Sequence, residues 1–380
     1  MEAGRFRTCP GQRGSRDDDL IPFGKRIMPK RCSALLLVAG CCMALAPRAG
    51  HGAEELPPVG RFVHEQTWSG ESLLTTPQIV PQQWESLSFQ PRWSGSVGAV
   101  ILQRARPVST PFLLNPVSGQ SLIDPAGFHF PFEGGPDVGL VRYGRWADVE
   151  FRYFGVHDWQ AAQGPLDSPD GFTLPIPGFD PAFGSFTLAS WYVSSLDSVE
   201  LNLRRNILPR LSLLAGFRYV RLHERLSFFA GDSALANGSI IGFNANNDLY
   251  GLQIGAEGLL WDRGGRFRVE GALKAGVFAN SARSSIGVNH IGSGGGGDPD
   301  QIFWLGHDHT AFVGDLNFVG VYQLTEHLAL RGGYQLLWLN GVAIASEQIH
   351  RLDLDTGDVG TNTSHGTFYH GVLVGLEAAW

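Results

Sequence analysis

The chain has 380 residues, which is enough for one large domain or two of ordinary size. Its 50 glycines and 22 prolines are too many for a helical protein, and 43% of hydrophobic residues is too few for a membrane protein built from many helices. Because 9 of the 29 basic and 4 of the 36 acidic residues precede residue 54, residues 54–380 carry 20 basic and 32 acidic side chains. Their net charge of −12 argues against a nucleic-acid partner.

The N-terminal 53 residues have the pattern of an export signal. From Met28, the basic "MPKRC" precedes the apolar run "SALLLVAGCCMALA", which is too short to span a bilayer. We therefore interpret residues 1–53 as an upstream extension and a signal peptide that starts at Met28 and is cleaved after Ala49 or Ala53. An alternative is a lipoprotein box at "VAGC", in which Cys41 is lipidated. All four cysteines precede residue 54, so no disulfide framework is expected in the exported part.

Beyond the signal, the dominant pattern is alternation of apolar and polar residues with a period of two. In "DVEFRYFG", for example, Val149, Phe151 and Tyr153 oppose charged neighbours. This period predicts β-strands with one apolar face, and no run of 18 apolar residues follows to predict a transmembrane helix. The ten alternating segments are 92–104, 136–144, 147–157, 196–206, 210–223, 248–261, 266–279, 310–324, 328–339 and 367–380.

The connections between these segments alternate between short and long. The second, fourth, sixth and eighth segments are followed by the tight "RW", "ILP", "DRGG" and "TEH", whereas the other connections are long and rich in Gly, Pro, Asp, Asn and Ser. Long structureless loops are unusual in a compact soluble domain, but outer-membrane barrels have short periplasmic turns and long external loops. We therefore predict an all-β fold, an antiparallel transmembrane β-barrel of about ten strands, with eight or twelve as alternatives. It spans residues 91–380, after an extended periplasmic lead-in at 54–90.

Two features indicate that the apolar face of the barrel meets lipid rather than an interior. The charged face has a single lysine, Lys274, where a soluble surface carries many. Tryptophans gather at the ends of the segments, as interfacial belts require. Those at the short-turn side are Trp93, Trp146, Trp261 and Trp380, and those at the loop side are Trp159 and Trp338. The alternative is a soluble sandwich or barrel.

The chain closes on the alternating strand "HGVLVGLEAAW", which ends in Trp380. In a barrel this strand pairs with the first one, so that no open edge meets lipid. We expect Trp380 to lie at the periplasmic interface and to act as a C-terminal signal for assembly.

If the apolar face meets lipid, the charged side chains of the strands point into the lumen. We expect there Arg142, Glu150, Arg152, Glu200, Arg204, Arg218, Glu257, Arg268, Glu270, Asp315, Arg331 and Glu377. Side chains just fill a barrel of about 8 strands, whereas a wide aqueous channel needs about 16. We therefore interpret these charges as structural packing of the lumen rather than as an ion-selectivity filter.

Several segments resemble a known family. "SVGAVILQRARP", "DVEFRYFGVHDW", "LLAGFRYVRLHE", "NNDLYGLQIGAEG", "LKAGVFAN" and "RGGYQLLWLNGVAIASEQ" are similar, in this order, to a family of predicted outer-membrane β-barrel proteins abundant in planctomycete bacteria. The resemblance extends over about residues 90–380. It implies a fold and a location in the outer membrane, but no substrate and no catalytic residue.

Histidines and aspartates at the loop-side rim are the candidates for chemistry. His157 and Asp158 end the third segment, and "GHDHT" places His307, Asp308 and His309 before the eighth. Such residues can activate water or bind a metal, but neighbours on an extended chain point in opposite directions. His307 and His309 can therefore converge without Asp308, and the interpretation we prefer is polar loop residues, with no catalytic or metal site.

Two loop motifs are incomplete. "DLDTGD" at 353–358 resembles a calcium loop, but Gly357 stands at a ligand position and Ser364 replaces the acidic residue that closes such a loop. "GSGGGGDPD" at 292–300 lacks the Gly-Lys-Ser/Thr that binds phosphate. We expect no cofactor.

We therefore expect an integral outer-membrane β-barrel with a structural or surface-interaction role, whose long external loops do any binding. The alternatives are a narrow diffusion channel and an outer-membrane hydrolase at the loop-side rim. The expected partners are outer-membrane lipid and the barrel-assembly machinery, and the sequence does not identify an external ligand.

Overall fold

A computed structural model describes residues 91–234, 237–291, 301–349 and 360–380, with backbone only at 288–291 and 301–304. The predicted signal peptide and upstream extension, the lead-in at 54–90, and the motifs at 292–300 and 353–358 lie outside the described residues. No helix among the described residues is long and apolar enough to cross a membrane.

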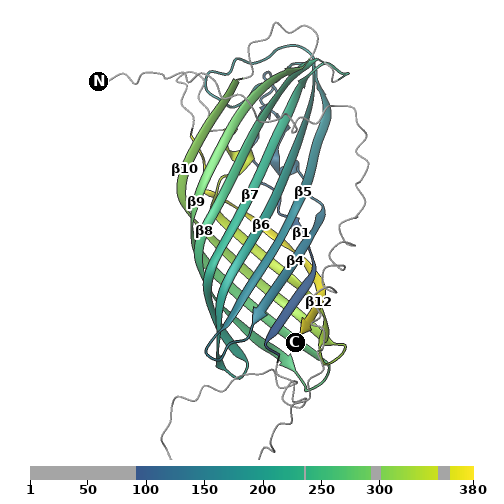
Figure 1. The fold of residues 1–380 in the computed structure, drawn as a ribbon. Coiled ribbons are helices and arrows are strands. Elements are labelled where there is room, and N and C mark those ends of the chain that lie inside the picture. Colours follow the sequence, from purple (N-terminus) through teal and green to yellow (C-terminus); the bar gives the residue numbers. More distant parts are fainter. Residues whose placement is uncertain (1–90, 235–236, 292–300, 350–359) are drawn as a thin grey trace, which may run out of the picture. The chain divides into compact units, whose positions relative to one another are not determined.

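Ten antiparallel strands form a closed barrel, which confirms the predicted fold (Figure 1). Around the barrel their order is β1-β12-β11-β10-β9-β8-β7-β6-β5-β4, so nearly every strand pairs with its neighbour in the sequence. The strands are β1 (Trp93–Arg104), β4 (Phe132–Arg142), β5 (Asp148–Ser168), β6 (Phe186–Leu208), β7 (Leu211–Gly231), β8 (Gly238–Asp262), β9 (Phe267–Ile291), β10 (Gln301–Gln323), β11 (Leu328–Val342) and β12 (His365–Ala379).

The barrel is closed by the pairing of β1 with β12, in register from Ser94 opposite Ala379 to Arg104 opposite Tyr369. Trp380 extends this seam, because its backbone N–H donates to the Trp93 carbonyl at 2.9 Å and its own carbonyl accepts from Trp93 at 2.9 Å. Every strand edge at this end is therefore paired, as a lipid environment requires.

The outer face of the lower barrel is apolar. Leu252 and Ile254 on β8 are 73% and 71% exposed, and Val277 on β9 is 64% exposed, which fits a surface that lipid covers. Large aromatic side chains border this band at both ends. Those near the short turns are Trp93, Trp146, Trp261, Phe267 and Trp380, and those farther up are Tyr153, Tyr219, Tyr250, Tyr334 and Trp338.

The upper aromatic residues mark the level at which the outer face becomes polar. The Tyr219 and Tyr250 rings lie 4.9 Å apart, and the Tyr219 hydroxyl donates to Asp248 at 2.5 Å. The Tyr153 hydroxyl likewise donates to Asp197 at 3.0 Å. These pairs place an amphipathic ring between an apolar band below and carboxylates above, as expected at a membrane–water interface.

Strands β5 to β10 continue far beyond this level, which corrects the expected loops. They are 21 to 25 residues long, whereas about 9–11 residues cross a bilayer. Much of the expected loops at 158–195, 224–247 and 280–309 is therefore strand. We call the parts of these six strands above the upper aromatic residues the tall wall.

The alternation in the sequence did not predict the tall wall, because the apolar residues of each strand move from its outer face to its inner face. In the lower part of β7, the exposed apolar residues are Leu213 and Phe217, at odd positions. Farther along, the apolar residues are Val220, Leu222 and Leu226, at even positions, and all three are buried inside. Below the upper aromatic residues, lipid covers the outer face of the strand. Above them, protein fills the interior of the barrel. The strand therefore continues, while its hydrophobic pattern shifts by one residue.

Two segments fold inward and, together with Phe172, Leu174 and Ile176 of the β5–β6 connection, fill the space inside the tall wall. We call residues 105–131 and 343–349 the inner plug; it includes β2 (Leu113–Leu114), β3 (Ser121–Ile123) and the short 3₁₀ helices η1 (Pro125–Gly127) and η2 (Ala345–Glu347). Its side chains form one apolar core with the wall. The core residues from the plug include Phe112, Leu113, Phe128, Phe130, Ile344 and Ile349.

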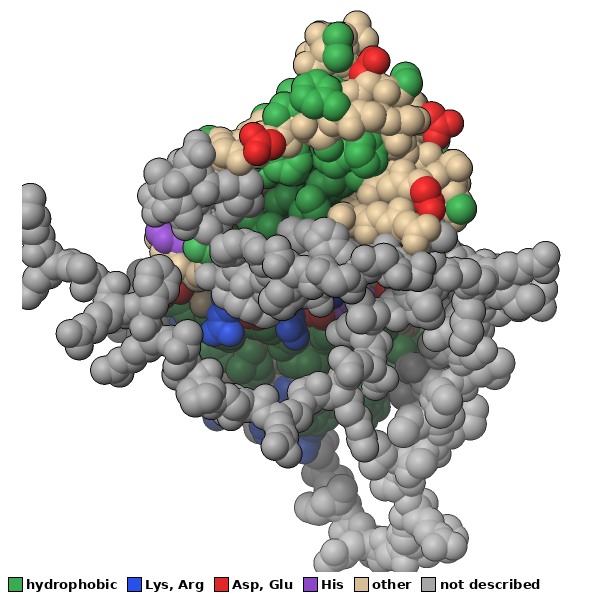
Figure 2. Space-filling model, turned by 90° about the horizontal axis from the view of Figure 1, so that it is seen from above, with side chains coloured by type: hydrophobic (Ala, Val, Ile, Leu, Met, Phe, Trp, Pro, Cys, Tyr) green, Lys and Arg blue, Asp and Glu red, His purple; other side chains and the backbone are tan. Residues whose placement is uncertain are grey.

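Seen from above, hydrophobic side chains lie deep inside the upper rim of the barrel (Figure 2). This corrects the expectation that the first and last long connections are purely external loops. Trp159, predicted for the loop-side aromatic belt, is also part of this core. It is fully buried, its ring centroid lies 5.1 Å from that of Tyr369 with the two planes tilted by 37°, and its indole N–H donates to the Leu102 carbonyl at 2.9 Å.

The remaining four strands are short, which leaves the tall wall open on one side. β11 pairs with β10 only as far as Asn340 opposite Phe312, and β4 pairs with β5 only as far as Asp137 opposite Phe154. Gly341, at the bulge where β11 ends, has φ of +78°, a conformation that favours glycine. There the chain leaves the barrel wall and enters the inner plug.

Candidate functional site

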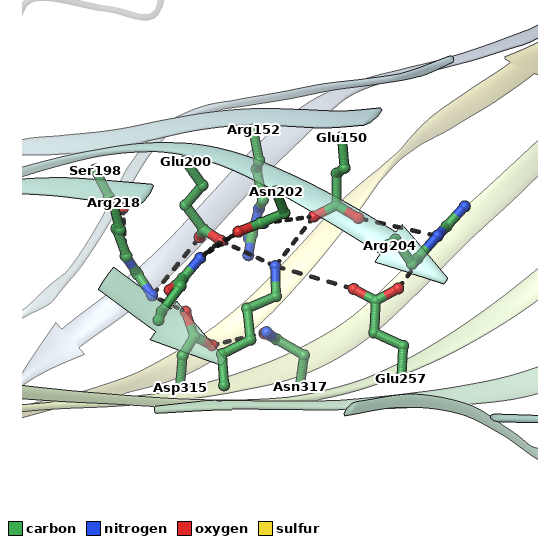
Figure 3. Close-up of polar contacts among 12 residues, drawn as sticks. Glu150, Arg152, Ser198, Glu200, Asn202, Arg204, Arg218, Glu257, Asp315 and Asn317 are labelled. Carbon is green, nitrogen blue, oxygen red and sulfur yellow. Dashed lines mark hydrogen bonds and ion pairs between the residues drawn. The ribbon is translucent and has the colours of Figure 1, made fainter. Parts of the chain in front are cut away.

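A network of buried charges crosses the lumen in the lower half of the barrel (Figure 3). Lys274 on β9 lies at its centre and contacts Glu150 on β5 at 3.1 Å and Glu200 on β6 at 2.9 Å. The Glu257 carboxylate on β8 lies 4.0 Å from the same ammonium group. Since β9 does not pair with β5 or β6, these contacts span the interior rather than follow the sheet.

A second cation completes this network. The Arg218 guanidinium on β7 lies 3.1 Å from Asp315 on β10 and 3.6 Å from Glu200, and it donates to the Ser198 hydroxyl at 3.0 Å. Arg152 on β5 contacts Asp137 at 3.0 Å. We call this network the charge plate; its charged members are Asp137, Glu150, Arg152, Glu200, Arg218, Glu257, Lys274 and Asp315.

Amides fill the remaining hydrogen-bond positions of the charge plate. Gln253 donates to both Glu200 and Asn202, at 2.9 and 2.8 Å, and Gln335 accepts from Arg152 at 3.2 Å. Lys274, Glu200, Arg218 and Asp315 are at most 3% exposed. Buried charges of this kind need partners, because each costs several kcal/mol to desolvate alone.

Below the charge plate lies a cavity of about 670 Å³. Its lining includes residues 209–211 of the β6–β7 turn, so it reaches the short-turn end of the barrel. Ion pairs extend along its walls, between Arg204 and Glu257 at 3.1 Å, Arg268 and Glu270 at 2.6 Å, and Arg331 and Glu377 at 3.3 Å.

The twelve charges expected in the lumen include one misplaced residue. Arg142 lies on the outer face, exposed, with its guanidinium 5.6 Å from the centre of the Trp93 ring. It belongs to the lower interface, where a long arginine side chain can reach water. The other eleven lie on the lumen side, as members of the charge plate or in ion pairs along the cavity: Glu150, Arg152, Glu200, Arg204, Arg218, Glu257, Arg268, Glu270, Asp315, Arg331 and Glu377.

Sequence reasoning missed several polar partners of these charges. Lys274 was placed on the charged face of its strand but was not included among the lumen charges, although it is the centre of the charge plate. Asp137 and the amides Asn202, Gln253 and Gln335 were also not singled out. Their positions could have predicted that they face the lumen, because each stands an even number of residues from a lumen-facing residue of the same strand.

A second polar cluster holds the inner plug against the tall wall. Glu224 on β7 is fully buried and accepts from Arg104 at 2.9 and 2.5 Å and from the Tyr192 hydroxyl at 2.6 Å. It also accepts the backbone N–H of Ala345 in the plug at 3.1 Å. Burial, together with this carboxylate, raises the pKa of Tyr192 well above its ordinary value, so that the phenol remains a hydrogen-bond donor.

Two asparagines hold the chain where it passes from β11 into the plug. The Asn247 side chain on β8 donates to the Ala343 carbonyl at 2.7 Å and accepts from the Ala343 N–H at 2.7 Å. Asn280 on β9 donates to the Gly341 carbonyl at 3.0 Å. The plug is therefore docked by specific hydrogen bonds as well as by apolar packing.

The rim histidines do not form one site. His157 lies on the outer face of β5, 3.0 Å from Asp197, and Asp158 beside it has φ of +65°. His307 and His309 lie on β10, at the other end of the tall wall, with ring centroids 5.9 Å apart. Asp308 lies on the opposite face of that strand.

Among the described residues, no group of three or more acidic, histidine or cysteine side chains is arranged to hold a metal ion.

Comparison with known proteins agrees with the fold. Residues 182–369 match the model of a family described as "Putative beta barrel porin-7 (BBP7)". This match confirms the resemblance to a family of predicted outer-membrane β-barrels. No curated protein matches the sequence.

Among solved structures, the outer-membrane protease OmpT of Escherichia coli is similar over 78% of this chain and 99% of its own, with 12% identity and a TM-score of 0.40. The toluene transporter TbuX of Ralstonia pickettii covers 77% of this chain and 90% of its own, with 8% identity and a TM-score of 0.33. The toluene transporter TodX of Pseudomonas putida covers 80% and 93%, with 10% identity and a TM-score of 0.30.

Proposed function

We propose that this protein is an exported outer-membrane β-barrel with a closed lumen, and that it acts as a surface scaffold through its tall wall and the loops above it. We further propose that it carries the signal peptide described above, belongs to a planctomycete-type envelope, and is inserted by the barrel-assembly machinery. Its partners are then outer-membrane lipid and an external ligand that the tall wall or its loops recognise.

One observation carries this proposal: the lumen is obstructed at two levels. The charge plate crosses it below, and the inner plug fills it above with an apolar core. Both obstructions have most of their polar atoms paired, so neither opens without a cost in free energy. The rim histidines on β5 and β10 are too far apart in strand order to act together, which supports a non-catalytic role over the hydrolase.

The second candidate function is a gated diffusion channel. It is favoured by the cavity of about 670 Å³, which reaches the short-turn end and is lined by paired charges as well as by uncharged residues. A channel requires the charge plate to separate and the inner plug to leave the wall, whereas a scaffold requires neither.

Conductance distinguishes the two candidates. We expect the folded full chain to give no discrete current steps in planar bilayers and no swelling of liposomes with small sugars, because both obstructions stay in place. Heat-modifiable migration on gels shows in the same samples that the protein is folded. Stable channels of uniform conductance in the unaltered protein would favour the gated channel.

Cell fractionation tests the location separately. We expect the protein in the outer-membrane fraction and resistant to carbonate extraction, because its exposed apolar band needs lipid. Recovery in the soluble periplasm would contradict the proposed location whatever the conductance.

Trp380 is proposed to act in assembly. Deleting it should lower the yield of folded protein in the outer membrane and leave unfolded chain in the periplasm, because the residue completes the β1–β12 seam. Its side chain is 56% exposed, so removal should change the thermal stability of molecules that do fold only slightly. Normal yield after the deletion would show that the residue is only a member of the aromatic belt.

A further inference from the structure

The two stacked histidines on β10 have a geometry that neither a scaffold nor a channel explains. His307 and His309 are two residues apart on one strand, so their side chains leave the same face. Both are exposed, their ring centroids are 5.9 Å apart, and their ring planes are inclined by 27°. No hydrogen bond to another described residue ties up their ring nitrogens.

The spacing of the two rings is close to that of a metal chelate. With Zn–N bonds of about 2.0–2.1 Å and a tetrahedral angle, two imidazoles on one ion have centroids about 5 Å apart. A small rotation about the side-chain bonds of exposed residues closes the remaining distance. Stacked neutral imidazoles gain little from contact alone, but they become strong ligands when an ion lies between their nitrogens.

The neighbouring strand places oxygen atoms beside the pair. Asn280 on β9 is the direct cross-strand partner of His309, and Ala282 is the partner of His307, so Asn280 and Ser284 are diagonal neighbours of His307. Cross-strand partners on one face have Cβ atoms about 5 Å apart. The Asn280 Oδ1 and Ser284 Oγ atoms are buried and have no hydrogen-bond partner among the described residues.

Access to this position is provided by the shape of the barrel. β11 pairs with β10 only from Phe312 onward, so the strand segment that carries the histidines has no described strand on its other side. The face that bears the histidines is the inner face of the wall, because their partners Asn280 and Ala282 are buried in the interior. The pair is therefore open to solvent above the upper aromatic residues.

We propose that His307 and His309 form a two-histidine chelate for a borderline divalent transition-metal ion, with Zn²⁺ as the reference ion. The two imidazoles bind the ion directly, and water completes its coordination. Imidazole favours Cu²⁺, Ni²⁺ and Zn²⁺ over Mg²⁺ and Ca²⁺, so the site selects by ligand type. Metal binding at this site does not depend on whether the lumen conducts ions.

Calorimetric titration with Zn²⁺ tests this site, using the mature chain folded in detergent, without the four cysteines of residues 1–53 and without a polyhistidine tag. We expect one equivalent to bind, and His307→Ala and His309→Ala each to weaken that binding at least tenfold. Binding should also weaken from pH 7.5 to pH 5.5, because imidazole must be deprotonated to bind a metal. Heat-modifiable migration shows that the variants are folded, as expected for changes at exposed side chains.

The matched control is His157→Ala, which removes another exposed histidine of the tall wall and should leave Zn²⁺ affinity unchanged. Electron paramagnetic resonance with Cu²⁺ counts the ligands, with two nitrogens expected in the unaltered protein and one in each single variant. Equal affinity in all four proteins would overturn the proposal, as would a loss confined to His157→Ala, which would place the ion beside Asp197. Absence of binding to the unaltered chain would also overturn it.

Discussion

Replacing Lys274 by methionine is expected to destabilise the barrel by several kcal/mol. The substitution keeps much of the side-chain volume but removes the one cation that lies within 4.0 Å of Glu150, Glu200 and Glu257. Breaking a buried ion pair from one side costs about 3–5 kcal/mol. We expect a loss toward the lower end of this range, because Arg204 still lies 3.9 Å from Glu150 and 3.1 Å from Glu257, and Arg218 lies 3.6 Å from Glu200. The measurement is the temperature at which the folded, heat-modifiable band disappears, together with unfolding in urea.

Two further variants identify the cause of that loss. The double variant Lys274→Met with Glu200→Gln removes one negative charge with the positive one, so it should recover part of the stability. Arg205→Met is the matched control, because Arg205 lies over Trp146 at the short-turn end and has no described contact with the charge plate. It should change stability by about 0.5 kcal/mol or less. Equal losses for Lys274→Met and Arg205→Met would show that the charge plate does not stabilise the barrel.

Replacing Glu224 by alanine is expected to release the inner plug while leaving the membrane-spanning barrel intact. The change leaves Arg104 buried without its carboxylate and removes the acceptor for Tyr192 and for the Ala345 N–H. Loss of such a buried pair costs about 3–5 kcal/mol, which would fall on the docking of the plug. The charge plate lies lower in the barrel and keeps all its partners.

A thiol probe in the plug measures this release. Ser346 is fully buried, and residues 54–380 contain no cysteine, so Ser346→Cys introduces a unique thiol in the mature chain. We expect its alkylation to be at least a hundredfold faster in the Glu224→Ala background, and the heat-modifiable band to be retained. Glu224→Gln should give an intermediate rate, since its amide oxygen still accepts hydrogen bonds. An unchanged rate in Glu224→Ala would mean that apolar packing alone holds the plug.

The order of the strands and the closure of the barrel could be read from the sequence. Alternation with a period of two is a local property, and tight turns such as "ILP" force sequence neighbours to pair. For this reason the segments at 92–104 and 328–339 agree closely with β1 (Trp93–Arg104) and β11 (Leu328–Val342). The lipid-facing side was also predictable, because the charged face carried almost no lysine.

The position of single residues near an interface was less predictable. Trp159 and Arg142 were placed by residue type, as a belt aromatic and as a lumen charge. Trp159 is instead buried against Tyr369, and Arg142 lies outside over Trp93. Both residue types combine an apolar part with a polar end, so each is stable on either side of such a boundary, and its neighbours decide the outcome.

The sequence by itself determined the parity of each charged residue, whereas the tertiary structure decided which charges meet. Lys274 lies far along the chain from Glu150 and Glu200, and only the closed barrel brings the three side chains together across the lumen. The tall wall and the inner plug were likewise decided by tertiary structure. Above the membrane, water covers the outer face of each strand and protein covers its inner face. The apolar inner face is stable because residues 105–131 and 343–349, together with Phe172, Leu174 and Ile176 of the β5–β6 connection, cover it.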